Sequence, residues 1–167
     1  MLLLAWLNLA LANPCQTTLS PTLHAQPDGP RCLAAAVATA MSLTTPQPTA
    51  DAIARGVKVS PQGIDPFDAQ RSAKDLGAEA LVFTGPPEAA ARLVEAGFAP
   101  VALVNRPGGV RHAVTVTGIE RGTTAAHGCG TALKAMEVFD PLTNTRMWQS
   151  AQGLCCPAIG RTTDGLF

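Results

Sequence analysis

Cys32 is the residue whose sequence context best suits a nucleophile. It begins an alanine-rich, nearly uncharged stretch, residues 32–43, whose composition predicts a buried helix. Unpaired backbone N–H groups and the positive end of the dipole lie at the start of a helix, and they stabilise a thiolate relative to a thiol. Gln26 lies six positions upstream on the segment that enters this helix, so its amide can reach an oxyanion that forms beside the sulfur. The pair predicts acyl transfer through a thioester.

A general base and an orienting carboxylate follow later in the chain. His112 heads a stretch of alternating residues, 110–120, that predicts a strand, and Asp140 ends the next predicted strand, residues 134–140. If these strands are neighbours, the Asp140 carboxylate can accept a ring N–H of His112 and fix its tautomer and direction. The four residues thus occur in the order, and are of the types, that a papain-type mechanism requires.

Each of these residues also has a purely structural interpretation. A cysteine in an alanine-rich helix is often a small core residue, and a histidine on a strand can be a satisfied edge residue. An Asp-Pro pair is common in turns. The functional interpretation depends on the combination of the four residue types, because none of them is specific alone.

The elements that must position these residues are visible in the periodicity and the turn signals. We expect helices at residues 32–43, 49–56, 65–76 and 86–96, and strands at residues 79–83, 100–105, 110–120, 134–140 and 146–149. Asp65 is the expected N-cap of the third helix, Pro66 its first residue and Gly77 its stop. Residues 14–30 are expected to be an extended lead-in, and a Pro-Gly-Gly turn joins two of the strands into a hairpin. Because helices precede antiparallel strands, the predicted class is α+β, with a long N-terminal helix packed on an antiparallel sheet.

The composition is typical of one compact domain with few charges. The chain has 167 residues, of which 47% are apolar and 14% charged, with 12 Lys and Arg against 12 Asp and Glu. The apolar residues can bury one core, and the low charge leaves no broad basic face that could neutralise phosphates. We therefore expect neither nucleic acid nor an anionic membrane surface as a partner, and no cofactor.

The beginning of the chain is apolar and uncharged. Residues 1–12 (MLLLAWLNLALA) are almost entirely apolar, and no charged residue occurs before Asp28. This run is shorter than the roughly 20 apolar residues that a membrane-spanning helix needs. Ala10 and Ala12 fit the small-residue site that a signal peptidase reads, so we interpret residues 1–12 as a signal peptide and residues 13–167 as the mature domain. Export predicts a secreted or periplasmic protein without stable membrane insertion after cleavage; the alternative is a buried N-terminal helix.

Export would place the five cysteines in an oxidising compartment. The adjacent pair, Cys155 and Cys156, is poorly suited to bond internally because the small ring would be strained. We therefore expect each of them to bond Cys15 or Cys129, which leaves the fifth cysteine, the candidate nucleophile, as the free thiol. The alternative is a zinc site that combines His127 with Cys129 and one of the adjacent pair, but no CxxC pair supports it and no metal is expected.

Four segments match one known family. They are Gln26-x5-Cys32 with the apolar helix after it, residues 93–105 (LVEAGFAPVALVN), residues 108–118 (GGVRHAVTVTG), and Asp140-Pro141-Leu142 with Trp148 beyond. Together they resemble the papain-like peptidases of the C39 type, the group that includes the leader-peptide-cleaving domains of bacteriocin transporters. The resemblance covers residues 26–148 and implies a papain-like fold. The roles that it implies are Cys32 as nucleophile, His112 as base and then acid, Asp140 as orienting carboxylate and Gln26 as oxyanion-hole side chain.

One departure from the family pattern leaves two alignments open. Family members follow the nucleophile with Gly-Pro, whereas here a Gly-Pro pair precedes Cys32. A slipped alignment puts Asp28 at the nucleophile position and Thr22, rather than Gln26, at the oxyanion position. The protein would then be an inactive member of the family. The spacing and the thiol at the helix end favour the alignment with Cys32 as nucleophile.

The predicted function is that of an exported cysteine peptidase that acts on a peptide substrate through a Cys32 thioester. The alternative is a C39-like domain without catalysis, with Asp28 at the nucleophile position, that binds an extended peptide in the same cleft. A third interpretation is a disulfide-stabilised secreted domain with no chemistry in its cleft. The sequence leaves the substrate open among an extended peptide, a leader sequence, a peptidoglycan stem peptide and a thiol-containing peptide.

Overall fold

The computed structural model describes residues 15–45, 48–82, 84–105, 111–124 and 128–151. The expected signal peptide, the adjacent cysteines Cys155 and Cys156, His127 and the Pro-Gly-Gly turn lie outside these residues.

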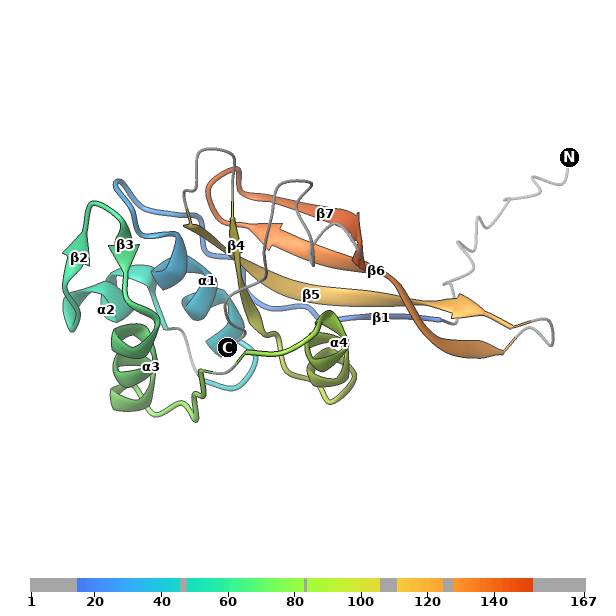
Figure 1. Ribbon diagram of the computed structural model, residues 1–167. Helices are drawn as coiled ribbons and strands as arrows, with labels where there is room; N and C mark the ends of the chain where they lie inside the picture. Colours follow the sequence, from blue (N-terminus) through green and yellow to red (C-terminus); the bar gives the residue numbers. More distant parts are fainter. Residues whose placement is uncertain (1–14, 46–47, 83, 106–110, 125–127, 152–167) are drawn as a thin grey trace, which may run out of the picture.

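An antiparallel sheet of five strands forms the centre of the described part of the chain (Figure 1). Its two long strands, β5 (Arg111–Thr123) and β6 (Cys129–Asp140), pair with each other, and β6 also pairs with β7 (Thr145–Ser150). The other side of β5 pairs with β4 (Val101–Asn105) near its start and with β1 (Gln16–Thr18) further along. The predicted hairpin of two neighbouring strands is confirmed by the β4–β5 pair.

The helices lie where the sequence predicts them. They are α1 (Cys32–Met41), α2 (Ala50–Arg55), α3 (Pro66–Asp75) and α4 (Pro87–Glu95). A small hairpin of β2 (Val59–Ser60) and β3 (Gly63–Ile64) connects α2 to α3. Figure 1 shows α1, α2 and α3 grouped at one end of the sheet with this hairpin, while α4 lies apart from them.

One expectation about these elements is wrong, and another is not confirmed. The helix that begins at Cys32 has ten residues, so a long N-terminal helix is not confirmed. Directly after its last residue, Met41, the Ser42 hydroxyl donates to the Thr39 carbonyl and accepts the N–H of Thr22 from the lead-in. Residues 79–82 do not form the expected strand, since no described strand pairs with them. The expected extended lead-in includes the strand β1.

Alternate residues of β4 enter two different cores. Val101 and Leu103 pack in one hydrophobic cluster with α1, whereas Ala102 packs in a second cluster with α4. Because successive residues of a strand point to opposite faces, α1 and α4 cover opposite faces of the sheet. The buried, alanine-rich α1 lies close to the sheet, and the Thr115 hydroxyl of β5 donates to the Ala36 carbonyl at 3.0 Å. The prediction of a buried helix that starts at Cys32 is confirmed.

Arg121 of β5 joins α4 to the sheet. Its guanidinium donates to Glu95 from Nε at 2.5 Å and to Glu88 from Nη2 at 2.8 Å, and both carboxylates belong to α4. Nη1 donates to the carbonyl of Thr131 on β6. The hydrogen bond from Arg121 holds the pKa of Glu95 below its ordinary value. One side chain therefore connects three elements.

Replacing Arg121 by methionine is expected to lower the free energy of unfolding by about 1–3 kcal/mol, because two carboxylates lose their charged donor while the aliphatic packing is kept. Urea denaturation followed by circular dichroism measures the change. Arg92→Met, which removes an exposed arginine from α4, is the matched control and should change stability by about 0.5 kcal/mol or less. Equal losses in the two variants would contradict the role given to Arg121.

A disulfide joins Cys15, just before β1, to Cys129, the first residue of β6, across 114 residues of sequence. The expected pairing of each of these cysteines with Cys155 or Cys156 is therefore wrong, and so is the alternative zinc site, because Cys129 has no thiolate to offer. Cys32 is the free cysteine of the described residues, as predicted. The bond fixes the start of the lead-in to the sheet.

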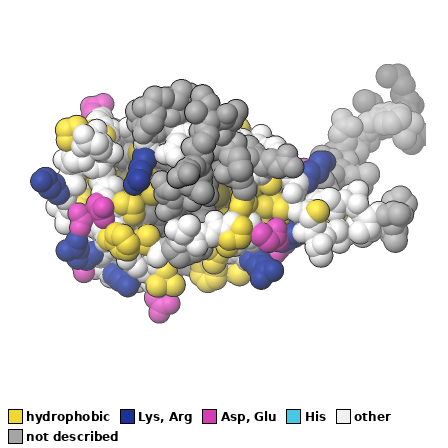
Figure 2. Space-filling model, viewed as in Figure 1, with side chains coloured by type: hydrophobic (Ala, Val, Ile, Leu, Met, Phe, Trp, Pro, Cys, Tyr) yellow, Lys and Arg dark blue, Asp and Glu magenta, His cyan; other side chains and the backbone are white. Residues whose placement is uncertain are grey.

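The face of the molecule in Figure 2 shows no concentration of one charge. Where described residues are visible in Figure 2, lysine and arginine side chains are scattered among aspartate and glutamate. The helices of the described residues are all too short or too polar to cross a bilayer.

Candidate active site

A cavity of about 660 Å³ brings three of the four predicted site residues together. Gln26, Cys32 and His112 line it. Residues 60–66, which include the tip of the β2–β3 hairpin and the start of α3, also line it, and so does Leu142. The cavity thus lies between the group formed by α1, α2 and α3 and the end of the sheet at which β5 begins.

Cys32 is the first residue of α1 and is partly exposed. The residue before it, Arg31, makes no side-chain hydrogen bond to the end of the helix, and the first turn contains no acidic residue. Arg31 instead contacts Asp51 on α2 at 3.3 Å. The positive end of α1 is therefore not neutralised by a carboxylate of its own first turn.

His112 and Asp140 form a buried pair on the neighbouring strands β5 and β6. His112 is 4% exposed and Asp140 is 6% exposed, and Nε2 of the imidazole lies 2.8 Å from Oδ1 of the carboxylate. The same Oδ1 accepts the backbone N–H of Leu142 at 2.8 Å. The turn after β6 therefore fixes the carboxylate, and the carboxylate fixes the ring. Because Nε2 of the ring faces Asp140, Nδ1 is the ring nitrogen that does not face this carboxylate.

Gln26 is held by its backbone and by its side chain. Its N–H donates to the Pro141 carbonyl at 2.7 Å, so the lead-in is tied to the turn that follows Asp140. Its amide Nε2 donates to the Gly29 carbonyl at 2.6 Å. An amide NH₂ group carries two hydrogens, so one remains for another acceptor. Gln26 and Asp140 are thereby connected through a single turn.

The two residues of the slipped alignment lie elsewhere. Asp28 is exposed and is not among the residues that line the cavity, although Pro30 is. Thr22 contacts Ser42 at the far end of α1 and does not line the cavity. The cavity therefore contains the cysteine and the glutamine of the other alignment.

The β2–β3 wall of the cavity was missed by the sequence analysis. Gly63 has φ +107, which requires glycine, and the Ser60 hydroxyl donates to the Gly63 carbonyl at 2.8 Å to close the turn. The run Val59-Ser60-Pro61-Gln62-Gly63-Ile64 carries a turn signal between two β-branched residues, and this signal is the one that could have predicted the hairpin.

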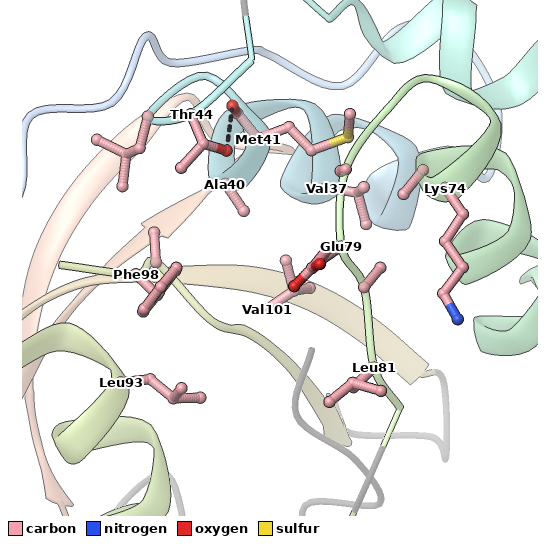
Figure 3. A pocket seen from close by; sticks show the side chains of 15 residues that line it. Val37, Ala40, Met41, Thr44, Lys74, Glu79, Leu81, Leu93, Phe98 and Val101 are labelled. Carbon is pink, nitrogen blue, oxygen red and sulfur yellow. Dashed lines mark hydrogen bonds between the residues drawn. The ribbon is translucent and has the colours of Figure 1, made fainter. Parts of the chain in front are cut away.

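A second cavity, of about 590 Å³, is lined by the C-terminal half of α1 and the residues after it, by the end of α3 and residues 78–81, and by residues between 93 and 101 (Figure 3). Its lining is mostly apolar, with Met41, Leu93 and Phe98 among the larger side chains, and it includes no cysteine or histidine. The described residues also contain no group of three or more potential metal ligands. Cys32 and His112 therefore line the first cavity and not the second.

No protein-family model and no curated protein sequence matches the chain. Solved structures do match it. The peptidase domain of Streptococcus ComA, a bi-functional ABC transporter involved in quorum sensing, has 14% sequence identity and a TM-score of 0.64, and the match covers 89% of this chain and 97% of that one. A double glycine motif protease from an AMS/PCAT transporter, in complex with the leader peptide, has 17% identity and a TM-score of 0.56, over 81% of this chain and 84% of that one.

These matches identify the fold of the chain as that of C39-type peptidase domains. The predicted resemblance and the predicted papain-like α+β class, with helices on an antiparallel sheet, are confirmed.

Proposed function

We propose that this protein is a cysteine peptidase that cleaves a peptide through Cys32. One observation supports this proposal most strongly: Cys32 and His112 line the same cavity, and His112 is oriented by a buried hydrogen bond to Asp140. The C39-type fold agrees with such a function. A nucleophile, a base and a group that orients the base are the parts that thiol catalysis needs.

In the proposed reaction, Nδ1 of His112 takes the proton of the Cys32 thiol, and the sulfur attacks the carbonyl carbon of the scissile peptide bond. The negative charge that develops on the carbonyl oxygen is stabilised by the second N–H of Gln26 Nε2 and by the start of α1. The tetrahedral intermediate collapses, the C–N bond breaks, and His112 gives its proton to the leaving amine. His112 then removes a proton from water, which hydrolyses the Cys32 thioester and releases the new carboxyl end.

We propose an extended peptide with a Gly-Gly pair before the scissile bond as the substrate class. The double glycine motif protease that shares this fold was solved with a leader peptide. The cavity, of about 660 Å³, is lined by residues of the lead-in, by residues 60–66 and by the turn after β6, so a peptide bound in it would contact several segments of the chain. Small residues next to the scissile bond would let the peptide backbone approach the sulfur closely.

We also propose that the protein works outside the reducing cytoplasm. The Cys15–Cys129 disulfide supports this location, because disulfides persist in oxidising compartments. The same proposal includes that residues 1–12 are a signal peptide and are cleaved from the mature protein.

Two variants of the lead-in test the proposed active alignment against the inactive one. Gln26→Ala is expected to lower kcat about 10²-fold with little loss of stability, because the oxyanion loses a donor. Asp28→Ala is the matched control, and it should cleave like the wild type because Asp28 is exposed outside the cavity. Cleavage of a Gly-Gly-containing peptide, followed by mass spectrometry, gives both rates.

The opposite pattern would contradict the proposal. If Gln26→Ala cleaves at the wild-type rate, the oxyanion role given to Gln26 is wrong. If neither the wild type nor any variant cleaves, but the peptide binds and Asp28→Ala weakens that binding, the protein is the peptide-binding alternative.

A further inference from the structure

The Asp28-Gly29-Pro30 segment is the motif that the proposed mechanism does not use. In the slipped alignment it would be the remnant of a lost nucleophile motif, yet its middle residue has a definite place in the structure. Gly29 has φ +82, in the left-handed region that side chains rarely adopt. Its carbonyl accepts two hydrogen bonds, from Gln26 Nε2 at 2.6 Å and from the backbone N–H of Arg31 at 2.9 Å.

The amide of Gln26 depends on this carbonyl for its orientation. Within the described residues, Gly29 is the hydrogen-bond partner of Nε2, and Oε1 is buried without a partner. A rotation of the amide by half a turn would place Oε1 against the Gly29 carbonyl, and two acceptors would then face each other. The carbonyl of Gly29 therefore selects the orientation in which the NH₂ group, rather than the oxygen, lies on its side.

We propose that Gly29 is a positioning residue: its left-handed backbone directs its carbonyl at Gln26 and so orients the amide that donates to the oxyanion. The inference depends on the proposed function, since it gives the Gly-Pro pair before Cys32 a role in the same site. Gly29 itself touches no reacting atom. It acts through Gln26, and through the N–H of Arg31 it also fixes the last residue before the nucleophile.

The structure offers a closely matched control for a test of Gly29. An added Cβ at Gly29 meets nothing within 4 Å, so Gly29→Ala changes the backbone preference without a clash. Gly77, after α3, has φ +88 and also has nothing within 4 Å of an added Cβ. Gly77→Ala therefore carries the same conformational strain at a position that does not line the cavity. If Gly29→Ala acts only through backbone strain, the two variants should show the same change in kcat.

The kinetic test compares the wild type with three single variants and one double variant on a Gly-Gly-containing peptide. Gly29→Ala is expected to lower kcat by about 10-fold or more with KM little changed, because the oxyanion donor is disordered while the rest of the cavity is kept. Gly77→Ala should keep the wild-type kcat. In a protein that already carries Gln26→Ala, adding Gly29→Ala should lower kcat no further. The reason is that Gly29 acts only by orienting the side-chain amide that this protein lacks. Equal kcat in Gly29→Ala and Gly77→Ala, or full additivity with Gln26→Ala, would overturn the inference.

A spectroscopic measurement separates this inference from the proposed function. The side-chain NH₂ signals of Gln26 are identified in the ¹⁵N–¹H spectrum by their loss in Gln26→Ala. One of the two protons should show slow exchange in the wild type and in Gly77→Ala, and fast exchange in Gly29→Ala. Unchanged signals in Gly29→Ala would refute the positioning role even if the peptidase is active. Full activity of Cys32→Ala would instead refute the proposed function and leave the spectroscopic result unaffected.

Discussion

Replacing Cys32 by alanine is expected to abolish cleavage of any peptide substrate, a loss of about 10⁴-fold or more in kcat, because no other described cysteine is a free thiol that could form the thioester. The cavity and the His112–Asp140 pair should remain. Cys32 is only partly buried, and the substitution removes a single heavy atom from its side chain. The melting temperature should therefore change by a few degrees at most.

The measurement is the initial rate of product formation by mass spectrometry, with a thermal melt of the same sample. Val37→Ala, further along α1, buried in the core and not part of the lining of this cavity, is the control for damage to the helix itself. It should lose more stability than Cys32→Ala but keep measurable turnover below its melting temperature. Turnover at the wild-type rate in Cys32→Ala would contradict the assigned nucleophile.

Replacing Asp140 by alanine is expected to have the second largest effect, a decrease of kcat by about 10²- to 10⁴-fold. His112 would lose the acceptor that holds Nε2, so the ring would no longer be held in one orientation. The variant should also lose about 1–3 kcal/mol of stability, since a buried ring nitrogen and the N–H of Leu142 both lose their acceptor.

Asp140→Asn separates orientation from charge. Its side-chain oxygen can still accept from His112 and Leu142, so it should retain more activity than Asp140→Ala while lacking the negative charge that stabilises the imidazolium. Rates are compared at a temperature at which all three proteins are folded. A folded Asp140→Ala variant with the wild-type kcat would show that the carboxylate has no part in the reaction.

Elements with local signals could be predicted from the sequence. The Asp65 carboxylate accepts the N–H of Phe67 at 2.8 Å, Pro66 begins α3, and Gly77 has the positive φ that ends it. Each of these signals acts within a few residues, so it can be recognised without knowledge of the fold. The β4–β5 hairpin was predictable for the same reason.

Pairings between distant segments could not be predicted. The Cys15–Cys129 bond spans 114 residues, and the cysteine content alone permits several pairings. β1 becomes a strand only because β5 passes beside it. Conversely, residues 79–82 have strand-like composition but no partner strand within the described residues, and they stay irregular. In both cases the tertiary neighbour, rather than the local sequence, decides the structure.

Three of the residues that line the candidate cavity could be singled out from the sequence, but most of its lining could not. The types and order of Gln26, Cys32, His112 and Asp140 single them out, because each chemical role requires a particular functional group. The sequence gives no distance between them, and it hides the β2–β3 hairpin that completes the cavity. The sequence also gives no sign of the role proposed for Gly29, because this role depends on a backbone carbonyl, which every residue has.

Alkylation of the native, non-reduced protein with iodoacetamide tests the activated nucleophile most directly. The tryptic peptide that starts at Cys32 and ends at Arg55 contains no other cysteine, so mass spectrometry reports the reaction at this sulfur alone. An ordinary thiol, with a pKa of about 8.5, is almost entirely protonated at pH 6 and reacts slowly there. We expect rapid labelling of Cys32 at about pH 6 in the folded wild type, and much slower labelling at that pH in His112→Ala. A Cys32 that reacts only after unfolding, or at the same rate with and without His112, would contradict the assignment of Cys32 as the catalytic nucleophile.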